Sequence, residues 1–328
     1  MKSSTNNIDI SIVIVNYRSW KHLKDCLNSL KFENNEFLFE VIVVDNNSSD
    51  KKIEVFQEDF SEVKFLQNTG NNGFANGCNF GAQHSKGKYL LFLNPDTIAN
   101  KDAIEKMWNF AKANPTKGIV SCEQKKSKGG YEKSQRIFLN TFTLFGLTRA
   151  LYRFLNKKRL QNKFETKENI LFPDWVSGSV VFISKEWLNQ INGWNEDYWM
   201  YYEDMDLCRR VQNSNGQIAL LKDAEIIHNH GGASRLNIKT ASITKTEVLI
   251  SKHVYISNHF KGFENGIAQC CLVVNNLIIK LLLGIIGVLL FFIPKMRLNV
   301  YLFLKMIRYY FSSLIRMSWL SKRSMNAK

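Results

Sequence analysis

The chain has 328 residues, of which 45% are hydrophobic and 22% are charged, and this composition excludes a disordered or fibrous protein. The formal net charge is +15, and residues 251–328 alone carry eleven Lys and Arg against one acid, Glu264. The length fits one domain of about 200–250 residues followed by an appended segment.

The N-terminal part predicts a parallel α/β sheet. Continuous apolar runs at 10–15, 41–44 and 89–93 are typical of strands that are covered on both faces. Between the first two runs, apolar residues recur at helical spacing from Trp20 to Leu30. This order of strand, helix and strand favours parallel pairing.

Each of these strands ends in a polar turn, with the sequences NYRS, DNNSSD and NPDT. Ligands of open α/β sheets bind at the carboxyl ends of the strands, so we expect one shared site that includes Asp45 and Asp96. A carboxylate at such a position suits a divalent cation beside a diphosphate. Taken singly, each acid fits a turn or a helix cap equally well.

A Gly- and Asn-rich segment, 68–82, precedes the third strand. Its glycines at 70, 73, 77 and 81 allow tight turns and a close approach of the backbone to a neighbour. The spacing matches neither the dinucleotide-binding pattern nor the phosphate-binding loop. The segment by itself predicts only a turn that leads into a helix.

The middle of the chain changes character at residues 121–170, which are rich in Lys and Arg. Within them, 137–160 predicts an amphipathic basic helix. Strands are expected again at 175–184 and 218–227.

Three acids, Glu203, Asp204 and Asp206, begin an expected helix at 204–211. Packed carboxylates raise one another's pKa values, which suits a general base, although acids also favour a helix N-terminus through the helix dipole. His228 and His230 follow the last expected strand, where a neutral imidazole suits either a metal ligand or a structural role.

The C-terminal part is apolar and basic. Residues 267–293 are largely apolar, but three polar residues interrupt them and leave an unbroken piece of 13 residues, 281–293. A spanning helix needs about 20 residues, so we favour an interfacial helical pair that includes 298–320. A span over 268–293 and a buried helix pair are the alternatives.

Cysteine spacing and the N-terminus indicate a cytoplasmic setting. None of the six cysteines forms a C-x-x-C pair or has a His at zinc-ligand spacing, which favours buried reduced thiols. The polar N-terminus has no signal-peptide pattern. Positive charge beside apolar and aromatic residues favours a membrane surface over nucleic acid as the partner.

Seven segments in order, between Ile10 and Ser234, resemble the inverting family 2 glycosyltransferases, in particular their rhamnosyltransferase-like branch. These segments are SIVIVNYRS, VIVVDNNSSD, NxGFAxGxNxG, LFLNPD, VSGSVVFIS, GWNEDYWMYYEDMDLCRR and HxxGG. The resemblance implies an α/β nucleotide-diphospho-sugar transferase domain of the A-type fold (GT-A), with a mostly parallel mixed sheet flanked by helices. This domain would cover 1–250, with 121–170 as a basic insertion facing the acceptor or membrane. Residues 251–328 would form C-terminal membrane-associating helices.

The resemblance also implies roles for individual residues. Asp204 would deprotonate the acceptor hydroxyl, and Glu203 would orient it or bind the acceptor. Asp96, the last acid of a D-x-D motif whose first acid is replaced by Asn94, would bind Mg²⁺ or Mn²⁺ with His228, and His230 competes for that place. The nucleotide sugar would contact Tyr17, Asp45, Asn47, Gly73, Phe74, Asn79 and Asn94. The sugar and acceptor would lie near Trp175, Ser177, Gly178 and Trp199.

The expected function is therefore a hexosyltransferase at the cytoplasmic face of the inner (plasma) membrane, peripheral or monotopic. Rhamnose is the favoured sugar, and galactose, glucose and N-acetylglucosamine remain open. The expected acceptor is a lipid-linked cell-surface glycan. The alternative is a non-catalytic nucleotide-sugar-binding scaffold of a glycan assembly complex. A processive synthase is disfavoured because its Q-x-x-R-W motif is missing from the sequence.

Overall fold

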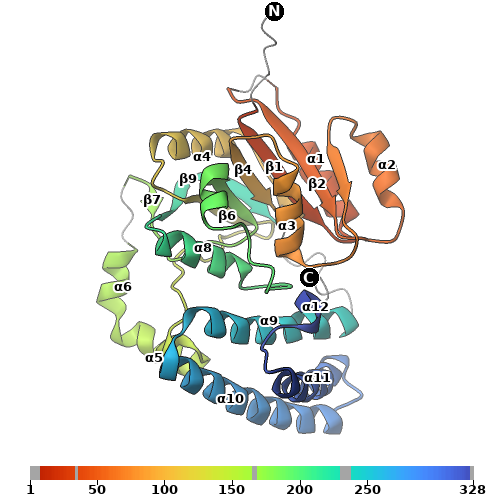
Figure 1. Cartoon of the computed structure of the whole chain (residues 1–328), viewed down its shortest axis with the longest axis vertical. Helices are drawn as coiled ribbons and strands as arrows, with labels where there is room; N and C mark the ends of the chain where they lie inside the picture. Colours follow the sequence, from red (N-terminus) through yellow and green to blue (C-terminus); the bar gives the residue numbers. More distant parts are fainter. Residues whose placement is uncertain (1–7, 34–35, 165–167, 230–237, 326–328) are drawn as a thin grey trace, which may run out of the picture. The chain divides into compact units, whose positions relative to one another are not determined.

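The computed structural model describes residues 8–33, 36–164, 168–229 and 238–325, which form two compact units (Figure 1). The first unit comprises Met1–Phe138, Lys157–Asn195 and Glu203–Gly232, and the second comprises Leu139–Asn156, Glu196–Tyr202 and Ala233–Lys328. The expected boundary at 250 falls inside one helix, α9 (Ile238–His259). The second unit therefore begins earlier than expected.

The described part of the first unit is built on one nine-stranded mixed sheet in the order β3-β2-β1-β4-β8-β6-β9-β5, with β7 paired to β9. The pairs among β3, β2, β1 and β4 are parallel, whereas β8 runs antiparallel to both β4 and β6. The strands are β1 Ile10–Asn16, β2 Phe39–Asp45, β3 Lys64–Gln67, β4 Tyr89–Leu93, β5 Thr97–Ile98, β6 Ile119–Lys126, β7 Ile170–Leu171, β8 Val180–Ser184 and β9 Ile218–His228. The strands expected at 10–15, 41–44 and 89–93 are confirmed.

Helices cover both faces of this sheet (Figure 1). Alternate residues of β1 point to opposite faces: Ile12 packs in a core with α1, α2 and α4, whereas Val13 faces α3. The helices of the first unit are α1 Trp20–Ser29, α2 Lys52–Asp59, α3 Phe74–Gln83, α4 Lys101–Ala113, α6 Lys157–Lys163, α7 Lys185–Gln190 and α8 Glu203–Asn213. The apolar, β-branched strands are therefore buried on both sides, as their composition predicts.

Helix α3 lies directly on the sheet because of two glycines. A Cβ atom at Gly77 would lie 2.7 Å from Cγ1 of Val15, and one at Gly81 would lie 2.4 Å from Cγ1 of Val13. Both distances are too short for ordinary packing. The close approach expected of the Gly-rich segment is thus an approach of helix to sheet.

The helical stretch expected at 137–160 is divided among three elements. The segment contains a 3₁₀ turn, η1 (Thr141–Thr143), followed by α5 (Gly146–Leu155) and the first residues of α6. The side chain of Asn140 accepts hydrogen bonds from the backbone N–H groups of Phe142 and Thr143, so a new turn starts there. The turn η1 and helix α5 belong to the second unit, and α6 belongs to the first.

The second unit contains α9, α10 (Gly262–Leu289), α11 (Pro294–Arg316) and α12 (Lys322–Met325), besides η1 and α5. Helices α9, α10 and α11 pack against one another. Helix α10 continues across the polar residues that were expected to break it, because the amide of Asn276 is buried and donates to the hydroxyl of Tyr310 at 2.9 Å. The polar residues at 275, 276 and 280 thus lie within one continuous helix, and whether it spans a membrane stays open.

By length and composition, α10 is the one described helix that is long and apolar enough to cross a membrane. Only 22% of its most apolar 18-residue window is buried. Helix α11 adds exposed apolar residues such as Phe311 and Leu314. Both helices therefore expose apolar side chains, and their contact with a membrane stays a prediction.

Candidate active site

The carboxyl ends of β1 and β2 meet, and Asp45 lies at their junction. Asn16 pairs with Asp45 in the register of the two strands, and its side-chain amide donates to Asp45 Oδ1 at 3.0 Å. The backbone N–H and the hydroxyl of Ser48 donate to the same carboxylate at 2.8 and 2.5 Å. Asp45 is 1% exposed, so its present partners are groups of its own loop and strand neighbour. Its contact with a nucleotide stays a prediction.

Tyr17 and Asn47 lie on the two loops that follow β1 and β2. Ser48 joins these loops, because its hydroxyl accepts from the backbone N–H of Arg18 at 2.9 Å. The Arg18 guanidinium lies 5.3 Å over the ring of Tyr17, which is 40% exposed. Asn47 has a positive φ of 57° and donates to the carbonyl of Thr69 at 3.2 Å. The paired loops thus present an aromatic ring and a cation to solvent.

Gly73, Phe74 and Asn79 hold α3 to its neighbours. Gly73 has a φ of 98°, and its carbonyl accepts from the Asn46 side chain at 2.9 Å. The ring of Phe74 packs edge-on against Trp194 at 5.5 Å. Asn79 makes two hydrogen bonds with the backbone of Trp194, at 2.9 and 2.8 Å. Asn79 therefore fixes the segment before α8, and its contact with a donor stays a prediction.

Asp96, after β4, meets His228 at the end of β9. Their Oδ1 and Nε2 atoms are 3.2 Å apart, and the backbone N–H of Asn229 donates to the carbonyl of Asp96 at 2.8 Å. The other imidazole nitrogen lies 3.0 Å from Gln124 Oε1 and 2.8 Å from Glu132 Oε1. Burial lowers the pKa of His228, but the hydrogen bonds to Asp96 and Glu132 outweigh this effect and raise the pKa to about 9.

His228 thus meets Asp96 through well-defined contacts. The competing candidate, His230, lies outside the described residues. Asn94 joins this end of the sheet through its backbone, because its N–H donates to the carbonyl of Ser179 at 3.0 Å.

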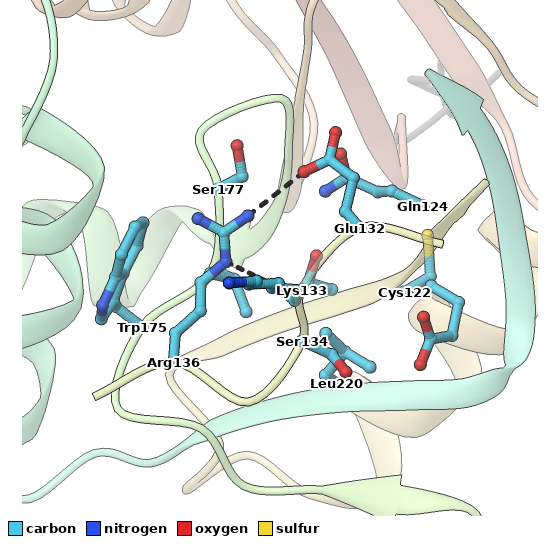
Figure 2. Close-up of a pocket in the computed structure, with 12 residues that line it drawn as sticks. Cys122, Gln124, Glu132, Lys133, Ser134, Arg136, Trp175, Ser177 and Leu220 are labelled. Carbon is cyan, nitrogen blue, oxygen red and sulfur yellow. Dashed lines mark hydrogen bonds and ion pairs between the residues drawn. The ribbon is translucent and has the colours of Figure 1, made fainter. Parts of the chain in front are cut away.

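Glu132 and Arg136 lie beside the candidate site, and the sequence analysis did not single them out. Their side chains form an ion pair of 3.2 Å, and the Arg136 guanidinium lies 4.4 Å over the ring of Trp175 (Figure 2). The Nε–H of Arg136 also donates to the carbonyl of Lys133 at 2.8 Å. One signal was present, since Glu132 is the lone acid between Glu123 and Glu165 in a strongly basic stretch.

Asp204 lies in the first turn of α8, beside the turn that precedes β8. Its Oδ2 accepts from the backbone N–H of Gly178 at 3.1 Å, and its Oδ1 accepts from the N–H of Met205 at 2.8 Å. Burial raises the pKa of Asp204, whereas the Gly178 hydrogen bond and the positive charge of Arg136 oppose that rise. A half-buried carboxylate with a raised pKa is suited to accept a proton.

The neighbouring acids differ from Asp204 in their surroundings. Burial, followed by the charge of Asp204, holds the pKa of Glu203 well above its ordinary value, and its Oε2 has no hydrogen-bond partner among the described residues. Asp206 accepts from Arg210 Nε at 2.7 Å, and Arg210 also donates to the carbonyl of Gly193 at 2.7 Å. Through Arg210, Asp206 therefore anchors α8 to the segment that contains Gly193. Its role in the acidic cluster is structural.

The expected sugar and acceptor residues divide between the two units. Trp175 donates its indole N–H to the carbonyl of Ile137 at 3.0 Å, and the Ser177 hydroxyl accepts from Ser179 at 3.0 Å. Trp175, Ser177 and Gly178 thus lie on one segment beside Asp204 and Arg136. Trp199 belongs to the second unit, where its ring packs under the Arg323 guanidinium at 4.8 Å.

The arrangement combines a proton acceptor with two donor atoms suited to a metal. A small cavity of about 10 Å³, room for about one water molecule, is lined by residues that include Gln124, Glu132, Arg136, Trp175 and Ser177 (Figure 2). Among the described residues, no group of three His, Cys, Asp or Glu side chains is placed to hold a metal ion. The binding of a divalent cation by Asp96 and a neutral His228, with further oxygens from a bound ligand or water, therefore stays a prediction.

Two family models match the chain. The model described as glycosyl transferase family 2 covers residues 11–181, and the model described as the N-terminal domain of galactosyltransferase covers 159–231.

Three curated relatives are similar over about two thirds of the chain. The low-salt glycan biosynthesis hexosyltransferase Agl10 of Haloferax volcanii is 28% identical over 236 residues, which are 67% of each chain. The rhamnosyltransferase WbbL of Escherichia coli is 23% identical over 67% of this chain and 83% of its own length. The N-acetylglucosaminyl-diphospho-decaprenol L-rhamnosyltransferase of Mycobacterium tuberculosis is 23% identical over 67% of this chain and 76% of its own length.

Two solved structures have the same fold. The S. aureus TarS 1–349 structure aligns with a TM-score of 0.50 and 17% identity over 81% of this chain and 68% of that chain. The structure of GalNAc-T7 with UDP, GalNAc and Mn²⁺ aligns with a TM-score of 0.53 and 16% identity over 74% of this chain and 48% of that chain. The expected single α/β domain of GT-A type is thereby confirmed.

Proposed function

Because the chain belongs to glycosyl transferase family 2 and is a glycosyltransferase, we propose that it transfers a hexose with inversion from a nucleotide diphosphate to a lipid-linked glycan. The observation that carries this proposal is the half-buried carboxylate of Asp204, which accepts a hydrogen bond from the Gly178 N–H and whose pKa the charge of Arg136 lowers. It lies at the edge of the sheet where ligands of α/β folds bind.

In the proposed reaction Asp204 is the general base. The acceptor hydroxyl oxygen attacks the anomeric carbon on the face opposite the leaving diphosphate. A new carbon–oxygen bond forms as the bond to the diphosphate breaks, and the hydroxyl proton passes to Asp204. Glu203 acts on this step by orienting Asp204 or the acceptor, because the two carboxyl groups are adjacent at the start of α8.

Asp96 and His228 would hold the divalent cation, either Mg²⁺ or Mn²⁺. When bound, the ion supplies Lewis-acid stabilisation of the departing diphosphate. The support is the chemistry of the donor set, one carboxylate and one imidazole 3.2 Å apart. Glu132 fixes the orientation of His228 through its second nitrogen, as second-shell carboxylates do for imidazole ligands.

The nucleotide would bind over the loops that follow β1 and β2. The exposed ring of Tyr17 offers a stacking surface, and Asn47 offers an amide at the same edge. Gly73 and Phe74 would border the nucleotide-binding region on the side nearest Gly178, since a Cβ atom at Gly178 would lie 3.3 Å from the Phe74 ring. The sugar would then lie between these loops and Asp204, near Trp175 and Ser177.

Rhamnose is the favoured sugar because two relatives are named rhamnosyltransferases. The test is a donor screen that measures release of dTDP or UDP from dTDP-rhamnose and from the UDP forms of galactose, glucose and N-acetylglucosamine. Release from dTDP-rhamnose alone is the expected result. Selective release from a UDP sugar contradicts the rhamnose assignment, and tight donor binding without any release favours the scaffold alternative.

The acceptor would be a glycan on a lipid diphosphate at the cytoplasmic face of the membrane. The support is the basic, apolar character of residues 251–328 together with the printed name of the mycobacterial relative, which acts on a diphospho-decaprenol. A peripheral or monotopic attachment and a span by α10 are both compatible with the exposed apolar residues of that helix.

The base assignment is tested with Asp204→Asn. We expect turnover to fall by about 10² to 10⁴, the usual contribution of a general base, while donor binding measured by calorimetry stays close to wild type. Asp223→Asn is the matched control, because Asp223 is an exposed residue of β9 that faces Lys106 at 4.0 Å. Wild-type turnover in Asp204→Asn rejects the assignment, and an equal loss in the control shows that the change is not local.

A further inference from the structure

The second unit contains a cavity of about 290 Å³ whose lining residues all belong to that unit. It is bordered by α9, α11 and the residues of α12. The volume is at the lower end of the range of about 300–1,000 Å³ for small-molecule sites, which suits a phosphate group better than a nucleotide sugar. Five cations and one acid line it: Lys305, Arg308, Arg316, Lys322, Arg323 and Glu247.

Two of these cations are held in place by neighbouring groups. Arg323 Nε lies 3.5 Å from Glu247 Oε1, and the ring of Trp199 supports the Arg323 guanidinium from the other side. Lys305 Nζ donates to the hydroxyl of Ser242 at 2.7 Å. Glu247 is 4% exposed and also accepts from Ser321 at 3.1 Å. The single acid therefore orients part of the cationic lining and leaves a formal excess of four positive charges.

Helix α11 carries an apolar stripe beside its cationic stripe. The exposed apolar side chains recur at helical spacing and are 42–72% exposed: Leu304, Ile307, Phe311, Leu314 and Ile315. The cavity-lining cations at 305, 308 and 316 each follow one of these positions by one residue, so they lie on the adjacent strip of the helix surface. A helix of this kind lies at a membrane interface, with its apolar side chains in lipid and its cations at the phosphate level.

We propose that this cavity binds the terminal phosphate of a membrane lipid. A phosphomonoester carries nearly two negative charges at neutral pH and a terminal diphosphate carries more, which matches the cationic excess better than the single charge of a phosphodiester. A free phosphate offers the same oxygens, but only a lipid also places chains against the apolar stripe. The inference is independent of the proposed function, because the diphosphate of a lipid-linked glycan joins the lipid to a sugar and has no terminal phosphate.

The test is co-sedimentation of the full chain with vesicles, without any sugar donor, so that its result is independent of transferase activity. Phosphatidylcholine vesicles contain either phosphatidic acid or phosphatidylglycerol, adjusted to equal surface charge. We expect about tenfold or stronger binding to phosphatidic acid, and loss of that preference in Arg308→Gln/Lys322→Gln. The control is Lys245→Gln/Lys261→Gln, which removes the same charge from α9 and its junction with α10, outside the cavity.

Each outcome decides the proposal. Preference for phosphatidic acid in the wild type and the control variant, lost in the cavity variant, supports it. Equal binding to both lipids, or an equal loss in the two double variants, means that only overall charge acts and overturns it. In a separate experiment, glycerol 3-phosphate is titrated into the full chain without vesicles. If it binds the cavity as tightly as the vesicles do, the ligand is a free phosphate and the lipid source is rejected.

Discussion

At the scale of single residues, Asp204 and its cationic neighbour make a prediction about pH. Burial raises the pKa of Asp204 above the ordinary aspartate value, and a protonated Asp204 cannot accept the acceptor proton. The value of kcat/KM should therefore fall on the acid side, at a pH above the ordinary value of 3.8, and rise as Asp204 ionises with increasing pH.

Arg136 should set the pH at which kcat/KM falls on the acid side, that is, the acid limb of its pH profile. Its positive charge lowers the pKa of Asp204, so removal of the charge in Arg136→Gln should move the acid limb of kcat/KM to higher pH. The matched control is Lys125→Gln, an exposed cation of β6 whose partner is Glu225 at 3.4 Å. A limb that stays in place in Arg136→Gln, or moves equally in the control, contradicts a direct effect of Arg136 on the base.

At the scale of elements, α3 predicts a cost for adding a single methyl group. The Cβ atom of Gly81→Ala would lie 2.4 Å from Cγ1 of Val13, so we expect a loss of about 1–3 kcal/mol in the free energy of unfolding, measured by thermal denaturation. Gly266→Ala in α10 is the control, because its Cβ atom would meet nothing within 4 Å and alanine favours a helix. A midpoint for Gly81→Ala at or above wild type contradicts the packing argument.

The sequence predicts elements best where burial alone determines them. Strands β1, β2 and β4 are continuous apolar runs, and the structure confirms them nearly to the residue. Strand β5 has two residues and depends on pairing with β9, so no local pattern marks it. The helical stretch expected at 137–160 begins with a separate turn capped by Asn140, and an amphipathic pattern alone does not mark that division.

The candidate site is likewise only partly visible in the sequence. Asp96, Asp204 and His228 follow recognisable motifs, and the meeting of Asp96 with His228 is in the structure. Glu132 and Arg136 have no motif, since their importance comes from a fold that places them against His228 and Trp175. Where a role depends on tertiary neighbours, the sequence alone shows at most an unusual residue type at that position.

At the scale of the whole molecule, positive charge and exposed apolar surface coincide in the C-terminal part. We expect the full chain to pellet with membranes and to stay there in about 1 M NaCl, where the Debye length of about 3 Å screens charge but leaves apolar contacts intact. The apolar contacts come from residues such as Ile285, Leu289 and Phe311, which are 52–73% exposed. Release by salt alone contradicts this expectation, and release by detergent fulfils it.

The order of the sheet and the most apolar helix along the chain also sets the order in which they can form during synthesis. The last strand of the sheet, β9, ends at His228, and α10 begins at Gly262, 34 residues further on. At about 5–20 residues per second, the ribosome completes the sheet roughly 2–7 s before it starts the most apolar helix. An open sheet edge and an unburied apolar helix therefore need not coexist in the nascent chain, which lowers the risk of aggregation.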